Sequence, residues 1–177
     1  MENDVLTRLV KGLTWLIMDV DGVLTDGGIY LNGDNTEGKR FDIQDGMGIT
    51  LARAAGLKIG IITGRRSTVV ERRAKELNID ELQQGCFYKE IALDLILGKY
   101  NLSPEQIAYV GDDVQDLPIL KRVGIPIAVN NARSEVLDCC VYVTQAKGGH
   151  GAIREVVDWL LKLRGQKEEA IKKVLQH

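Results

Sequence analysis

Short apolar runs that end in polar, glycine-containing turns constrain the fold of this chain more than any other feature. Three of these runs precede turns rich in acidic, hydroxyl or glycine residues: 15–18 before 19–25, 57–62 before 63–67, and 107–110 before 111–116. Apolar runs of this length, bounded by turn signals, are typical of strands that are buried on both faces. Such strands are usually parallel, so their carboxyl ends meet at one edge of a sheet, where α/β proteins bind ligands.

The segments between these runs carry helix signals. Helices are predicted at 3–11, 45–55, 68–77, 87–100, 117–123, 133–137, 152–163 and 166–176, and two further strands at 125–129 and 140–143. Ser67 is the expected N-cap of the helix at 68–77. Residues 79–84 are a poor strand candidate. Strands that alternate with helices predict an α/β fold with a Rossmann-like parallel sheet flanked by helices.

Residues 28–43 have the pattern of a β-hairpin. Apolar and polar residues alternate on both sides of a tip rich in glycine and asparagine. A lone hairpin is only marginally stable in water, so we expect it to lie as a flap on the rest of the protein or on another subunit. Neither the stretch from Asp21 to Gly46 nor the one from Thr63 to Lys89 is long enough for an inserted cap domain.

Length and composition indicate one domain spanning residues 1–177, with a charged helical tail at about 165–177. The net charge of −2 gives no argument for binding nucleic acid or an anionic membrane. No apolar run approaches the ~18 residues of a membrane span, and the N-terminus has no signal-peptide pattern. The three cysteines include an adjacent pair and form no disulfide framework, which suits a cytoplasmic location.

Asp19 and Asp21 stand one residue apart at the end of the first apolar run. Alternate side chains of a strand share a face, so both carboxylates are expected to start out in the same direction. Gly22 then lets the chain turn away sharply. Two carboxylates this close repel unless a cation lies between them, and oxygen ligands favour a hard ion such as Mg2+. The alternative is a solvated acidic loop.

A second acidic cluster, Asp112, Asp113 and Asp116, follows the third apolar run. Taken alone, it is equally typical of a helix N-terminus, where the helix dipole favours acids. Because parallel strands bring their carboxyl ends together, the cluster is expected beside Asp19 and Asp21. Several carboxylates around one small cation match the ligands that Mg2+ takes, with water and a phosphate oxygen completing the shell.

The order Asp-x-Asp-Gly-x-x-Thr, Thr-Gly-Arg, a lysine near a helix start and Gly-Asp-Asp-x-x-Asp resembles the four motifs of the haloacid dehalogenase-like phosphatases. The resemblance implies that Asp19 is the phosphorylated nucleophile and that Asp21 protonates the leaving group and then activates water. Lys89 would neutralise the phosphoryl group. By the same resemblance Mg2+ is bound by the Asp19 carboxylate, the Asp21 backbone carbonyl and Asp112. Asp113 and Asp116 would act behind these ligands or through water, as the resemblance implies.

The Thr63-Gly64-Arg65 turn offers a hydroxyl and backbone N–H groups at a helix start, which suit a phosphoryl oxygen. The alternative is an ordinary strand-to-helix turn. The resemblance adds Thr25, the threonine of the first motif, to the residues expected to bind the phosphate or the rest of the substrate, and Arg66 is a further candidate as a cation beside this turn.

Within the family, residues 14–160 resemble the phosphatases of 3-deoxy-D-manno-octulosonate 8-phosphate, through the motifs above and the segments 45–49 and 148–155. That resemblance implies a Mg2+-dependent homotetramer in which the hairpins pack together and a neighbour helps to close the site. The implied substrate is a phosphorylated eight-carbon sugar acid whose dephosphorylated product feeds lipopolysaccharide synthesis.

Two positions depart from the pattern of that group, Gln44 and Arg66, and they leave a nine-carbon sugar acid 9-phosphate or another sugar phosphate open as substrate. The substrate carboxylate needs a cation, for which Arg65 and Arg66 are the candidates. A receiver-like or inactive partner module is the alternative from another class. Asp21 and the second acidic cluster favour a catalytically active enzyme over such a module.

Overall fold

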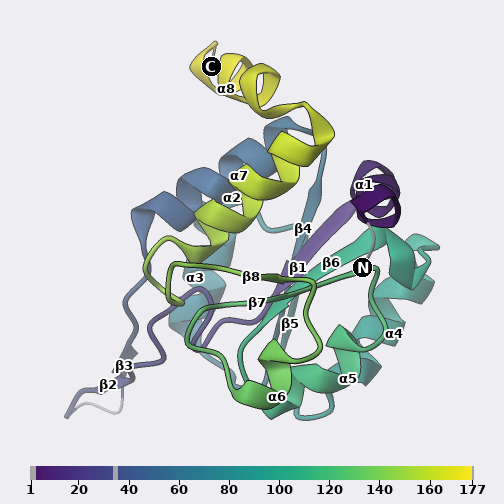
Figure 1. Cartoon of the computed structure of the whole chain (residues 1–177). Coiled ribbons are helices and arrows are strands. Elements are labelled where there is room, and N and C mark those ends of the chain that lie inside the picture. The colour runs from purple at the N-terminus through teal and green to yellow at the C-terminus, as the bar shows by residue number, and fades with distance from the viewer. Residues whose placement is uncertain (1–2, 34–35, 177) are drawn as a thin grey trace.

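The computed structural model describes residues 3–33 and 36–176, and its centre is a six-stranded parallel sheet (Figure 1). The strands are β1 (Trp15–Met18), β4 (Lys58–Thr63), β5 (Glu81–Gln84), β6 (Ile107–Gly111), β7 (Ile125–Ala128) and β8 (Tyr142–Val143). Their order is β5-β4-β1-β6-β7-β8. From β1 the chain adds β4 and β5 on one side, and it then adds β6, β7 and β8 on the other side of β1. A reversal of this kind marks the point where open α/β sheets bind ligands.

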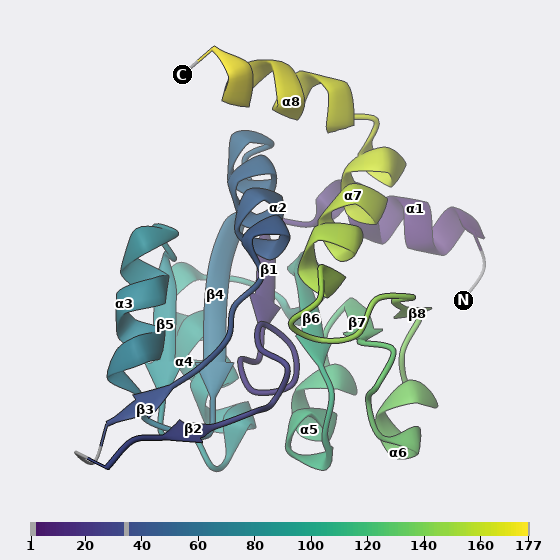
Figure 2. The same ribbon diagram turned by 90° about the vertical axis from the view of Figure 1, so that its left-hand side faces the viewer.

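Helices cover both faces of the sheet (Figure 2). On one face lie α1 (Asn3–Gly12), α2 (Ile43–Ala54), α3 (Thr68–Glu76) and α7 (Ala152–Arg164); on the other lie α4 (Lys89–Tyr100), α5 (Leu117–Leu120) and α6 (Ser134–Leu137). Leu16 and Met18 of β1 are buried under the first group, and Trp15 and Ile17 under the second. This alternation follows from the two-residue period of a strand. The predicted α/β fold class is confirmed.

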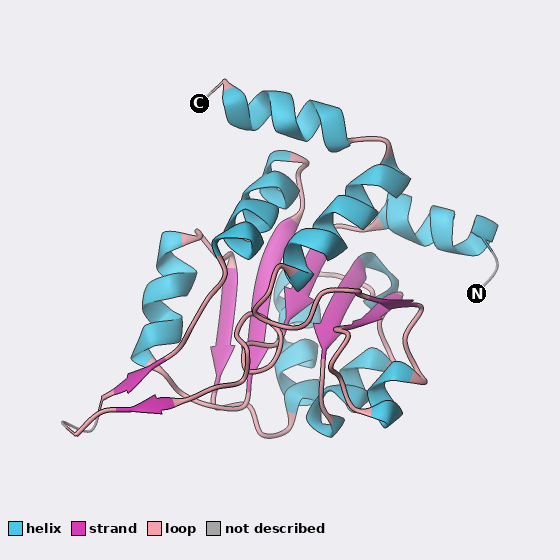
Figure 3. Ribbon diagram, turned by 60° about the vertical axis from the view of Figure 1, so that its left-hand side comes forward, coloured by secondary structure: helices cyan, strands magenta, loops and turns pink. Residues whose placement is uncertain are grey.

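The predicted hairpin is confirmed, with shorter strands than the alternation suggests. β2 (Tyr30–Leu31) pairs antiparallel with β3 (Glu37–Gly38), while residues 34–35 of the predicted hairpin lie outside the described residues. The hairpin projects from the end of the sheet to which the strand arrows point (Figure 3). A single antiparallel bridge joins Thr25 to Phe41 at its base. We call residues 25–41 the flap.

Two details of the predicted elements are wrong. The helix expected to open at Asp45 begins two residues earlier at Ile43, because the Asp42 carboxylate accepts a hydrogen bond from the Gln44 N–H at 2.8 Å and caps it. Ser67 holds the N-cap position of α3 as predicted, but its side chain makes no capping hydrogen bond.

Residues 79–84 are also a correction, because they include β5. β5 lies at the edge of the sheet, where a strand pairs with one neighbour and is less enclosed than a central strand. Polar residues are therefore tolerated in it, and a regular apolar pattern is not required. β5 pairs with β4 from Glu81 to Gln84. Glu81 is buried at this edge, where Lys99 and the Tyr100 hydroxyl donate to its carboxylate at 2.6 and 2.7 Å.

The C-terminal segment forms a helix, α8 (Lys167–Leu175), as expected, with His177 of the predicted tail outside the described residues. It packs near the end of α2, where Lys173 Nζ donates to the Ala54 carbonyl at 3.4 Å. Figure 2 places α8 at the end of the molecule opposite the flap. The helices of the described chain are too short and too polar for a membrane span.

Candidate active site

Three aspartates meet at the carboxyl ends of the two central strands. Asp19 follows β1, Asp112 follows β6, and Asp116 ends the short 3-10 helix η2 (Val114–Asp116). One carboxylate oxygen from each lies within 4.8 Å of the others. The cluster flanks the point where the strand order reverses, which is where the sequence placed the site.

Lys89, the first residue of α4, supplies a buried cation to this cluster. Its Nζ lies 2.7 Å from Asp19 Oδ2 and 2.7 Å from Asp116 Oδ1, and its side chain is 1% exposed. Although burial opposes its charge, Asp19 and Asp116 hold the pKa of Lys89 above its ordinary value. Lys89 is therefore a buried, ion-paired lysine and not a solvated one on a helix surface.

Asp116 is fully engaged with groups of the protein. Besides Lys89, the Tyr109 hydroxyl donates to its Oδ1 at 2.6 Å, and the N–H groups of Asp112 and Asp113 donate to its Oδ2 at 3.0 and 3.3 Å. This arrangement fixes the turn that carries Asp112. Asp113 is exposed, and its carboxylate caps η2 by accepting from the Val114 N–H at 2.7 Å.

Without a further cation, the ionised forms of the Asp19 and Asp112 carboxylates are unfavourable. Burial raises the pKa of Asp19 to about 6, although Lys89 acts in the opposite direction. Burial, and then the charges of Asp19 and Asp116, raise the pKa of Asp112 to about 8. Asp112 Oδ1 is buried and has no hydrogen-bond partner among the described residues. These residues fit a hard divalent cation, which would stabilise the ionised carboxylates.

The expected phosphate-binding turn lies beside the aspartates in one cavity of about 340 Å³. Its lining comprises Asp19, Asp21, Thr63, Gly64, Arg65, Asp112, Asp113, Val114 and Gln115. Thr63 ends β4 and is buried, whereas the Arg65 side chain is half exposed at the mouth. Arg66 does not line this cavity; it lines a neighbouring cavity of about 700 Å³ between the flap and the start of α3.

The Asp21 side chain lines the same cavity as Asp19 and Asp112 and contacts the flap. β1 ends at Met18, so the strand alternation expected to align Asp19 with Asp21 does not extend to them. Lys39 Nζ donates to Asp21 Oδ1, and the Lys39 side chain is 0% exposed. Arg65 Nε lies 3.9 Å from Asp21 Oδ2. The candidate general acid is therefore held by a cation from the flap.

The flap is tied to the site at a second point, where Arg65 Nη2 donates to Glu37 Oε2 at 2.8 Å. The sequence reasoning missed Glu37 and Lys39, and it missed Gln115 in the cavity lining. A signal for Lys39 was present, because alternate residues 37, 39 and 41 of a strand share a face and Phe41 is the apolar member. No comparable signal marks Gln115.

Thr25 requires a correction, because it is fully buried and cannot reach a substrate. Its hydroxyl donates to the Val20 carbonyl at 3.3 Å and accepts from the Gly27 N–H at 3.2 Å. The threonine therefore shapes the loop that carries Asp21. Such short-range side chain-to-backbone bonds are typical of threonine in turns.

The fold and the site together define a phosphate-ester hydrolase, and comparison with known proteins agrees. The profile of the haloacid dehalogenase-like hydrolase family matches residues 81–156, which include Lys89, Asp112 and Asp116. The chain belongs to the haloacid dehalogenase-like phosphatases. It is 42% identical to the 3-deoxy-D-manno-octulosonate 8-phosphate phosphatase KdsC of Escherichia coli K12, over 94% of this chain and 88% of that protein.

Solved structures support the same relationship. A putative hydrolase of this superfamily from Legionella pneumophila superposes with a TM-score of 0.94 at 37% identity, covering 98% of this chain and 96% of that one. The 3-deoxy-D-manno-octulosonate 8-phosphate phosphatase of Moraxella catarrhalis, solved with magnesium, phosphate and KDO, gives 0.93 at 36% identity, covering 98% and 99%. The resemblance read from the motifs is confirmed.

Proposed function

We propose that this phosphatase hydrolyses the phosphate monoester of an ulosonic sugar acid, with 3-deoxy-D-manno-octulosonate 8-phosphate as the favoured substrate. The observation that carries the proposal is the pairing of buried Lys89 with Asp19 at the strand-order reversal, in a chain 42% identical to KdsC. Phosphate monoesters hydrolyse extremely slowly unaided. A carboxylate nucleophile divides the reaction into two easier displacements.

In the first displacement the Asp19 carboxylate attacks phosphorus, and the bond between phosphorus and the sugar oxygen breaks. Asp21 gives a proton to the departing sugar oxygen. In the second displacement water attacks the aspartyl-phosphate, Asp21 accepts its proton, and inorganic phosphate leaves with the Asp19 carboxylate restored. Thr63 and Gly64 line the cavity with Asp19, and the Thr63 hydroxyl and the N–H groups that follow it would bind phosphoryl oxygens at the start of the turn.

The charge on the transferring group is offset by two sources. Lys89 contributes a fixed cation that costs no reorganisation during the reaction, since Asp19 and Asp116 already hold it. Mg2+ would be held by Asp19, Asp112 and the Asp21 backbone carbonyl, and it would supply further neutralisation of the phosphoryl oxygens.

The cation at the mouth of the cavity favours an acidic substrate. Arg65 is half exposed and needs only to exchange Glu37 for a substrate carboxylate, a geometry that guanidinium groups bind well. The flap contacts two residues of the cavity lining, Asp21 through Lys39 and Arg65 through Glu37, so we expect the sugar to extend from the phosphate site toward the flap. A nine-carbon sugar acid 9-phosphate remains the second candidate, because Gln44 and Arg66 depart from the pattern of the eight-carbon enzymes.

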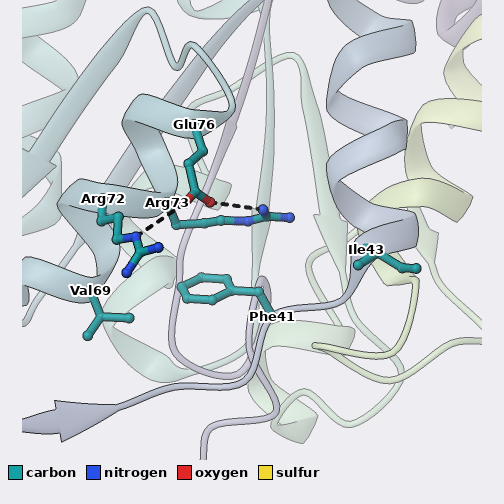
Figure 4. Close-up of a pocket in the computed structure, with 6 residues that line it drawn as sticks. All are labelled: Phe41, Ile43, Val69, Arg72, Arg73 and Glu76. Carbon is teal, nitrogen blue, oxygen red and sulfur yellow. Dashed lines mark hydrogen bonds and ion pairs between the residues drawn. The ribbon is translucent and has the colours of Figure 1, made fainter.

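We further propose self-association, as a homotetramer, through the flap and the start of α2. Apolar side chains there are exposed: Ile29, Tyr30, Leu31, Ile43 and Met47, with Leu31 and Ile43 each 81% exposed. Of these, Ile43 lines a cavity of about 310 Å³ in which the Arg73 guanidinium lies 5.8 Å from the Phe41 ring centroid (Figure 4). Apolar patches of this kind are typical of interaction surfaces. Light scattering on the purified protein measures the oligomer directly, and a monomer would contradict this proposal.

The test of the activity is phosphate release from the eight-carbon and nine-carbon sugar acid phosphates, with and without Mg2+. The eight-carbon substrate is expected to be preferred, and Asp19→Asn is expected to abolish turnover. Preference for a nine-carbon substrate would keep the mechanism and change the substrate. Absence of Mg2+-dependent turnover of either would refute the proposed substrate class.

A further inference from the structure

The loop that precedes α7 lies directly against the backbone that follows Asp21. A Cβ on Gly148 would fall 1.7 Å from the Gly22 carbonyl oxygen, and one on Gly149 would fall 2.3 Å from the Asp26 nitrogen. The Gly149 N–H donates to the Val23 carbonyl at 2.9 Å. The two backbones therefore touch, which requires residues without a side chain at both positions.

Gly22 is also crowded by the second acidic cluster. A Cβ on Gly22 would fall 2.1 Å from Asp112 Oδ2, and its φ is +91°. Gly22 is thus held by the Asp112 carboxylate, which crowds its Cα, and by Gly148, which crowds its carbonyl group. The Asp21 carbonyl, which is assigned above to the metal, belongs to the peptide that ends at the Gly22 nitrogen.

The loop is in turn anchored by Asp45 of α2. Asp45 is 1% exposed, and its Oδ1 accepts from the Arg154 N–H at 2.9 Å. The N-cap residue of α7 is Gly151, which has no side chain to cap the helix, so the Asp45 carboxylate takes that role from another helix. A Cβ on Gly48 would lie 2.9 Å from Arg154 Cα, so the two helices meet at their backbones.

We propose that residues 147–151 form a brace that sets the position of the Gly22–Val23 peptide and, through Gly22, that of the Asp21 carbonyl, and that Asp45 is the positioning residue that holds this brace in place. The metal part of this inference rests on the proposed Mg2+-dependent function. Groups that orient metal ligands typically contribute about 10- to 100-fold to affinity. Loosening the brace should therefore weaken Mg2+ binding without removing any ligand.

Gly148→Ala tests the brace, with Gly124→Ala as its matched control. Neither glycine has a φ in the left-handed region, so alanine at either position meets crowding rather than backbone strain. A Cβ on Gly124 would fall 2.5 Å from the Glu105 carbonyl oxygen, so alanine there also clashes with backbone. Glu105 precedes β6, whereas the active-site Asp112 follows that strand, so the control clash lies at the opposite end of β6 from the site. The measurements are the Mg2+ dissociation constant by calorimetry and amide hydrogen exchange of residues 19–27 in the metal-free protein.

Gly148→Ala is expected to weaken Mg2+ binding by about tenfold or more and to speed exchange in residues 19–27. Gly124→Ala is expected to leave both within about twofold of wild type, although it too lowers the melting temperature. Equal effects of the two variants on both measurements would overturn the proposal. If wild type binds no Mg2+, the proposed cofactor fails, while the exchange measurement still decides whether the brace exists.

Asp45 supplies an independent pair of variants. Asp45→Ala removes the acceptor from the α7 N-terminus and is expected to reproduce the effects of Gly148→Ala on exchange and on Mg2+ binding. Asp45→Asn keeps an acceptor oxygen and is expected to restore most of both. If Asp45→Ala folds and exchanges in residues 19–27 like wild type, Asp45 does not hold the brace and the proposal is wrong.

Discussion

Replacing Lys89 by methionine removes the buried cation and keeps most of its volume. The variant leaves Asp19 and Asp116 facing each other without the nitrogen that contacts both at 2.7 Å. Hydrogen bonds to charged groups are worth about 1.5–3 kcal/mol each, so two of them give about 3–6 kcal/mol. Removing one partner from a buried ion pair costs about 3–5 kcal/mol, which is the expected loss for the metal-free variant in mild alkali.

The loss should depend on pH, with a sign set by Asp19. Its pKa in the folded wild type is about 6, above the ordinary 3.8, so the folded state binds a proton that the unfolded chain releases. This contribution to the free energy of unfolding falls as pH rises from about 4 to about 6 and is then constant. Without Lys89 the pKa of Asp19 rises further, so the variant continues to lose stability above that range.

Urea denaturation in the presence of a chelator, at about pH 5 and about pH 8, measures both effects. Lys99→Met is the matched control, because Lys99 also contacts a buried carboxylate, that of Glu81 at 2.6 Å, but its own side chain is 59% exposed. A loss of the same size at both pH values would refute the reasoning. So would a loss at the higher pH no larger than that of the control.

Three further outcomes follow from the site. Mg2+ binding at about pH 7 should release about 0.9 proton from Asp112, whose pKa is about 8, and far less at about pH 9; calorimetry in buffers of different ionisation enthalpy measures this. Glu37→Gln should lower KM for the sugar acid phosphate about two- to fivefold, because it frees Arg65 from a surface ion pair. Lys39→Met should lower kcat by about tenfold or more in assays of steady-state phosphate release, because it releases the Asp21 side chain.

Much of the site could be predicted because it depends on strand ends. Asp19, Thr63 and Asp112 follow buried apolar runs, and parallel pairing brings such ends together regardless of what lies between them. Lys89 could be placed only through the family resemblance. The two carboxylates that hold it, those of Asp19 and Asp116, come from residues distant in the sequence, and nothing local distinguishes it from a solvated lysine.

The errors share a different cause, which is that they depend on tertiary contacts. Thr25 fits the motif but turns inward to bond its own loop, and Asp21 turns toward a flap cation whose position the sequence does not fix. Residues 79–84 are a poor strand candidate by their sequence, yet Glu81 to Gln84 form β5 because they pair with β4 at the edge of the sheet. The sequence predicts that Asp45 opens a helix, whereas its carboxylate accepts a hydrogen bond from the Arg154 N–H at the start of another helix, α7.

The bridge between Thr25 and Phe41 has a consequence for how such enzymes can diversify. Because Thr25 and Phe41, the first and last residues of the flap, are paired with each other, the two ends of this segment lie side by side. Exchanging that segment for a longer or shorter one alters neither the order of the sheet nor the separation of its anchor points. The wall facing the substrate can therefore be replaced as one contiguous piece of gene, while the aspartates and Lys89 remain on a scaffold encoded on either side of it.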